Sequence, residues 1–149
     1  MKREKKALEN FSMELNCAQA VLSAFAEELG VEEKKALKLA SGFGGGMGRL
    51  AGTCGAVTGA VMVIGLRYGY TAGDDKDAKD QTYRLVRHFA GQFTTKYGSI
   101  LCKELLGHDV STTEGYREAV ASGVFKTICP GCVQGAVMIL EELLEDSTN

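Results

Sequence analysis

The chain has 149 residues, which is the size of one ordinary domain. Its 17 Lys and Arg residues nearly balance 19 Asp and Glu residues, giving a net charge of −2, so we expect no nucleic acid as the main partner. The mean hydropathy is −0.05, and the longest apolar stretch, residues 56–66, is short for a bilayer span. We therefore expect no membrane insertion. The charged N-terminus lacks a secretory-signal pattern, which predicts a cytoplasmic protein.

Three features of the composition are unusual: one proline, nineteen glycines and five cysteines. Permanent disulfides are rare in a reducing compartment. The cysteines are therefore inert core residues, metal ligands or working redox thiols. With only two histidines and no tryptophan, the question of function depends mostly on the cysteines.

Apolar residues recur at helical spacing from Lys5 to Leu29 and predict a first helix over that range. An alternative is a new helix capped by Asn16, with Gln19 three residues later as in a capping box. Residues 31–41 predict a short helix. The glycine-rich stretch Gly42–Gly48 follows it.

Residues 54–68 are apolar at nearly every position, which is typical of a buried helix. Thr53 is a natural N-cap for it. Residues 74–97 predict a long amphipathic helix. Its expected core-facing positions are Tyr83, Val86, Ala90, Phe93 and Tyr97.

Three shorter signals complete the chain. Ser99 is expected to cap a short helix that contains Cys102, and Ser111 with Glu114 predicts a capping box for a helix ending near Gly123. A last helix is expected from the CPGC motif to about residue 145. Because no strand pattern is present, residues 1–149 predict one all-α domain. We expect a compact helical bundle with a glycine-rich loop before a buried central helix.

The strongest chemical signal is the CPGC motif, Cys129 to Cys132. Two cysteines separated by two residues can close a small disulfide or ligate one metal. Pro130 suits the first position of a helix, which makes Cys129 the N-cap. The positive end of the helix dipole should then lower the pKa of the Cys129 thiol. The alternative is that both residues are buried, unreactive thiols.

The other cysteines also lie near predicted helix starts. Cys54 is placed in the first turn of the buried helix, Cys102 three residues after Ser99, and Cys17 directly after Asn16. Cysteines that served only as core residues would be scattered along the helices. We therefore expect Cys17, Cys54, Cys102 and at least one CPGC cysteine to converge on one site.

The glycine-rich stretch lacks the residues of a phosphate-binding loop. Its backbone N–H groups and Arg49 could form an anion-binding nest. The interpretation we favour is a tight connection that lies against the buried helix.

Three segments of the chain together resemble the C_GCAxxG_C_C family of redox-active proteins. They are NCAQAV (16–21), GGGMG (44–48) and CGAVTG (54–59), with Cys102 and the Cys129 region behind them. The resemblance covers nearly the whole chain and implies a small helical protein with cysteine chemistry. It matches the family cysteines to Cys17, Cys54 and Cys102, with Cys129 rather than Cys132 as the fourth.

Two functions remain open from the sequence. The first is a redox protein that uses the thiols of Cys17, Cys54, Cys102, Cys129 and Cys132 for thiol–disulfide exchange or electron transfer with a partner protein. The second is an all-cysteine iron–sulfur or zinc site built from Cys17, Cys54, Cys102 and Cys129 or Cys132. A helical interaction module without chemistry would leave the clustered helix starts unexplained. Association of the chain with copies of itself stays open.

Overall fold

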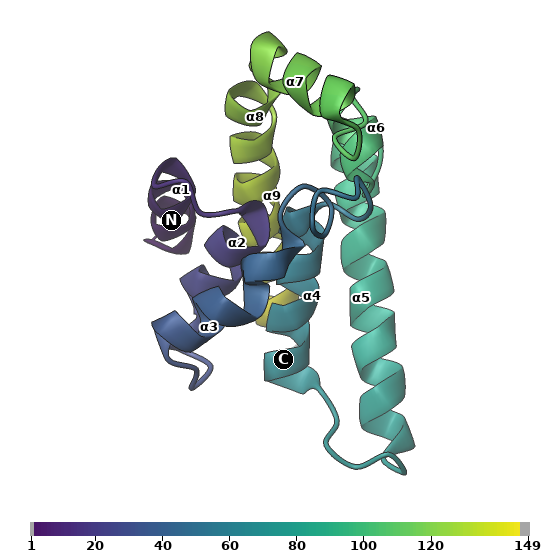
Figure 1. Ribbon diagram of the computed structural model, residues 1–149. Coiled ribbons are helices and arrows are strands. Elements are labelled where there is room, and N and C mark those ends of the chain that lie inside the picture. Colours follow the sequence, from purple (N-terminus) through teal and green to yellow (C-terminus); the bar gives the residue numbers. More distant parts are fainter. Residues whose placement is uncertain (1, 147–149) are drawn as a thin grey trace.

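The computed structural model describes residues 2–146 and is all-α, as the sequence predicts (Figure 1). Within this range the structure contains no strand, only an isolated antiparallel bridge between Thr53 and Leu101. The elements are α1 (Lys2–Ser12), α2 (Cys17–Ala26), α3 (Glu33–Ala40), the 3₁₀ turn η1 (Ser41–Phe43), α4 (Gly55–Tyr68), α5 (Lys76–Tyr97), α6 (Cys102–Leu106), α7 (Thr113–Ser122), α8 (Val124–Thr127) and α9 (Cys129–Asp146).

Helices α2, α4 and α9 form the centre of the bundle, and α1, α3 and α5 cover it. α2 and α4 pack most closely, because Gly59 of α4 lies against the backbone of Ala18. The prediction of a buried helix is confirmed for the first part of α4, where most residues up to Ile64 are buried. The structure does not make α4 the most buried helix. Eight of the ten residues of α2 are buried, whereas α4 exposes its C-terminal turn.

The segment 124–145 is long and apolar enough to cross a membrane, judged by length and composition alone. In this structure it comprises α8, Ile128 and most of α9, and 44% of its apolar window is buried. Its buried face packs against α1, α2, α4 and α5. The apolar character of this segment is therefore explained by its place in the protein core.

The helix expected over residues 5–29 is in fact two helices. The chain leaves α1 after Ser12, and Glu14 adopts a left-handed conformation with φ of 67°. α2 then starts with the capping box of the alternative prediction. The side chain of Asn16 accepts from the N–H of Gln19, and the side chain of Gln19 accepts from the N–H of Asn16. The local cap therefore prevails over the continuous apolar periodicity.

The predicted Ser99 cap is wrong. Leu101 is the N-cap of α6, and the hydroxyl of Ser99 accepts from the N–H of Leu101, ahead of the helix.

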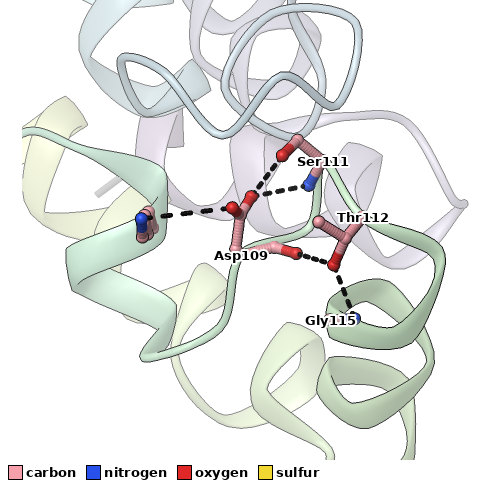
Figure 2. A network of polar contacts seen from close by, with 5 residues as sticks. Asp109, Ser111, Thr112 and Gly115 are labelled. Carbon is pink, nitrogen blue, oxygen red and sulfur yellow. Dashed lines mark hydrogen bonds and ion pairs between the residues drawn. The ribbon is translucent and has the colours of Figure 1, made fainter.

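Two other predicted caps are displaced by one residue. Cys54 itself, rather than Thr53, is the N-cap of α4. Thr112, rather than Ser111, caps α7, where its hydroxyl accepts from the N–H of Gly115. Figure 2 shows the reason: the Ser111 hydroxyl and N–H both donate to the carboxylate of Asp109, which withdraws Ser111 from the helix.

The core stripe of α5 is also displaced. The buried residues are Leu85, Phe89 and Phe93, whereas Tyr83 is about half exposed and its hydroxyl lies 3.5 Å from that of Tyr70. The apolar residues of this helix form two neighbouring stripes, the predicted one and the one that is buried. Both have helical spacing, so the periodicity of the sequence does not distinguish them.

The glycine-rich loop between η1 and α4 contains a rare left-handed turn. Five consecutive residues, 45–49, have φ between 57° and 72°. Hydrogen bonds close the turn, from Gly48 N to Gly42 O at 2.7 Å and from Gly52 N to Gly46 O at 2.9 Å. Met47 and Arg49 adopt this conformation at a cost of about 1–2 kcal/mol each. The loop is thus a tightly bonded connection, as favoured from the sequence.

Candidate functional site: a five-cysteine cavity

All five cysteines line one cavity of about 120 Å³. The cavity lies where two hydrophobic clusters meet. Cys54 and Cys132 belong to the main core, Cys102 and Cys129 belong to a smaller cluster under α6, α7 and α8, and Cys17 packs against both. In Figure 1, α2 and α4 begin near the middle of the molecule, below α7 and α8. The structure therefore brings together the cysteines that the sequence singled out.

Cys17 and Cys54 approach each other because glycine occupies the first position of α4. A Cβ on Gly55 would lie 3.0 Å from the N of Ala18 and 3.1 Å from the Cβ of Cys17. Only a residue without a side chain allows the first turns of α2 and α4 to meet this closely without a shift. The glycine after Cys54 thus determines how near the two thiols come.

The backbone around Cys54 is hydrogen bonded to the backbone around Cys102. The N–H of Cys54 donates to the carbonyl of Ile100 at 2.7 Å, and the N–H of Cys102 donates to the carbonyl of Gly52 at 2.7 Å. The left-handed loop supports this bridge from behind, since a Cβ on Gly46 would lie 2.9 Å from the Cβ of Cys102. Residues 46 and 52 therefore set the position of Cys102.

The CPGC motif begins α9, but this helix directly follows another. The short helix α8 ends at Thr127, and only Ile128 separates it from α9. Cys129 is thus the first residue of α9 and not an exposed N-cap, and Pro130 without its N–H accounts for the interruption. On the outer side, the Tyr97 hydroxyl donates to the carbonyl of Gly131 at 2.7 Å.

The thiols form two pairs, and neither pair lies within the CPGC motif. The largest influence on the pKa of Cys129 is its thiol contact with Cys17, and the largest influence on the pKa of Cys54 is its thiol contact with Cys132. The contact with Cys17 lowers the pKa of Cys129, and the pKa of Cys17 is raised in return. The contact with Cys132 lowers the pKa of Cys54, which the N–H groups of Ala56 and Val57 lower further.

Within CPGC the two cysteines consequently differ. The pKa of the Cys132 thiol is raised, chiefly because it donates its proton to Cys54 and is buried. Cys129 was expected to be the more acidic thiol, and the direction of its pKa agrees. The cause differs, since the thiol of Cys17 rather than the helix dipole favours its thiolate.

Cys102 belongs to neither pair. Burial, together with the charges of Cys54 and Cys129, raises the pKa of its thiol to about 12. It is therefore a neutral thiol at physiological pH. This role was not visible from the sequence, because it depends on contacts between α4, α6 and α9.

Apart from the cysteines and Asn16, the side chains that line the cavity are apolar. Its hydrophobic members come from α1, α6, the end of α8 and the junction with α9; they are Phe11, Leu105, Leu106, Phe125 and Ile128. Sequence analysis did not single these residues out, and only the proximity of Leu105 and Leu106 to Cys102 could have drawn attention to them. No charged side chain lines the cavity. Arg49, the candidate anion ligand, instead stacks over Tyr116 at 4.4 Å.

The donor set of the site consists of sulfur alone, which suits zinc and iron–sulfur clusters. The arrangement does not fit such a group. Within residues 2–146, no three or more His, Cys, Asp or Glu side chains are placed to hold one metal ion.

The comparisons with known proteins agree with a redox site. Residues 15–143 match the model of a family described as "Putative redox-active protein (C_GCAxxG_C_C)". The chain belongs to the C_GCAxxG_C_C family. No curated protein and no solved structure shows significant similarity to it. Membership in this family supports a redox role in general, and the chemistry has to be argued from the cavity itself.

Proposed function

We propose that this member of the C_GCAxxG_C_C family is a dithiol oxidoreductase that forms disulfides between helices. The observation that carries the proposal is the convergence of all five cysteines on one cavity, in which the pKa of Cys54 depends most on Cys132 and the pKa of Cys129 depends most on Cys17. In each pair one thiol has a lowered pKa and the other retains its proton. This is the division of roles that thiol–disulfide exchange requires.

The exchange proceeds in two balanced steps with a disulfide substrate. The thiolate of Cys54 attacks one sulfur of the substrate, the substrate S–S bond breaks, and the first leaving group takes the proton of Cys132 and departs as a thiol. The thiolate of Cys132 then attacks the Cys54 sulfur of the mixed disulfide, that S–S bond breaks, and the second leaving group departs as a thiolate that takes a proton from water. The protein pair loses two electrons and the substrate gains two.

Disulfide mapping tests the proposal. The reduced protein is oxidised with two equivalents of a small disulfide, one for each pair, trapped with iodoacetamide, digested and examined by mass spectrometry. We expect Cys54–Cys132 and Cys17–Cys129 linkages. A dominant Cys129–Cys132 linkage would contradict the assigned pairs, and the absence of any intramolecular disulfide would contradict dithiol chemistry.

A second experiment separates dithiol chemistry from the iron–sulfur or zinc alternative. Protein purified without oxygen is analysed for metal and for its visible spectrum. We expect a colourless protein with five titratable thiols. Stoichiometric iron with charge-transfer absorption, or stoichiometric zinc with protected thiols, would replace the proposal by a metal site.

A further inference from the structure

The cavity itself restricts what can reach the thiols. We propose that the substrate of the cysteine pairs is a small, uncharged organic disulfide with apolar substituents, which enters the cavity, rather than a protein disulfide or a charged one. This inference rests on the proposed dithiol function and adds the class of substrate.

The first argument is size. A cavity of about 150 Å³ accommodates benzene, so the 120 Å³ here holds a molecule of similar or smaller size. Cys54, Cys102, Cys129 and Cys132 are between 2% and 9% exposed. The disulfide of a folded partner cannot reach sulfurs at this depth without opening the site, whereas a dialkyl disulfide with methyl or ethyl groups fits.

The second argument is charge and polarity. An ionised group that enters an apolar cavity loses its hydration and needs a partner there. No Lys, Arg, Asp or Glu lines the cavity. Asn16 is the lining residue with an amide side chain, and its amide is already engaged. Its oxygen accepts from Gln19 N, and its nitrogen donates to the carbonyls of Ala40 and Ser41.

The third argument is the position of the reacting sulfurs. Cys54 and Cys129, the thiols with lowered pKa, both line the cavity together with their partners. The apolar side chains Leu105, Phe125 and Ile128 line the same cavity. A bound dialkyl disulfide thus has its S–S bond beside a nucleophilic sulfur and its alkyl groups against hydrocarbon.

The test compares disulfides that differ in charge. Fully reduced protein reacts with dimethyl disulfide, with uncharged 2-hydroxyethyl disulfide, with cationic cystamine, with anionic dithiodiglycolate and with glutathione disulfide. Each rate is divided by the rate for the same protein unfolded in urea, which removes differences in intrinsic reactivity. We expect this ratio to be at least about tenfold higher for dimethyl disulfide than for any charged disulfide.

A variant changes the selectivity in a predicted direction. Leu105→Lys places an ammonium group at the cavity wall and should raise the ratio for dithiodiglycolate relative to dimethyl disulfide. Leu39→Lys makes the same change at an exposed leucine of α3 that does not line the cavity, and it should leave all ratios unchanged.

The outcomes distinguish the two proposals. If charged disulfides and glutathione disulfide give ratios equal to that of dimethyl disulfide, the inferred substrate class is wrong and the dithiol function stands. If none of the disulfides oxidises the folded protein, the dithiol function itself is wrong. Equal responses of the Leu105→Lys and Leu39→Lys variants would also overturn the assignment of the cavity as the binding site.

Discussion

Gly59 offers the sharpest test of how close packing builds this site. A Cβ at this position would lie 2.8 Å from the carbonyl oxygen of Ala18 and 3.0 Å from the Cα of Ala18. It would also lie 3.2 Å from the Cβ of Val21. The first distance is about 0.7 Å shorter than a normal contact. The two nearest atoms belong to the backbone of α2, so no side-chain rotation relieves the overlap.

The expected cost of Gly59→Ala follows from two opposing effects. Overpacking a well-packed core costs about 1–3 kcal/mol, and alanine gains about 1 kcal/mol over glycine inside a helix. We expect the free energy of unfolding to fall by up to about 2 kcal/mol. Because Ala18 follows Cys17, the movement of α2 should also slow formation of the Cys17–Cys129 disulfide.

Gly65 is the matched control in the same helix. It is exposed, and a Cβ there would have no neighbour within 4 Å. Gly65→Ala should therefore stabilise the protein by about 0.4–1 kcal/mol. The assay is urea unfolding followed by circular dichroism for both variants. Equal free energies of unfolding for Gly59→Ala and Gly65→Ala would refute the close contact between α2 and α4.

Three further predictions concern the capping box, the CPGC turn and the neutral thiol. Asn16→Ala removes the cap of α2 and two hydrogen bonds to η1 and the end of α3; we expect a loss of about 1–2 kcal/mol in urea unfolding, and an unchanged midpoint would contradict the cap. Tyr97→Phe removes the hydroxyl that donates to Gly131; we expect a loss of about 1 kcal/mol and an altered pH profile for alkylation of Cys132, which a purely structural role would leave unchanged. Burial raises the pKa of Cys102 from its ordinary value of about 9 to about 12. Its contribution to stability is therefore complete below pH 9 and is lost as the pH rises toward 12. Cys102→Ala should flatten the decline in unfolding free energy over that range, and an identical slope in both proteins would contradict the raised pKa of Cys102.

Local sequence determined most of the helices and their ends. The Asn16–Gln19 capping box and the left-handed Gly98 and Gly123 act within a few residues, so they are legible without the fold. The helix start at Cys17 follows from the same capping box. The boundaries that shifted are those where a neighbour competes for the cap, as Asp109 does for Ser111.

Tertiary structure alone decided which thiols meet. The spacing of CPGC suggests a pair between Cys129 and Cys132. The pKa of Cys129 depends most on Cys17, however, and the pKa of Cys132 depends most on Cys54. Contacts between thiols depend on where α2 and α4 lie against α9, and that placement comes from side-chain packing across the whole bundle. The left-handed turn at residues 45–49 is likewise held by contacts with Gly52 and Cys102. The sequence therefore identified the five cysteines that line the cavity, and only the packed helices determined their neighbours, the direction of their pKa shifts and the small cavity around them.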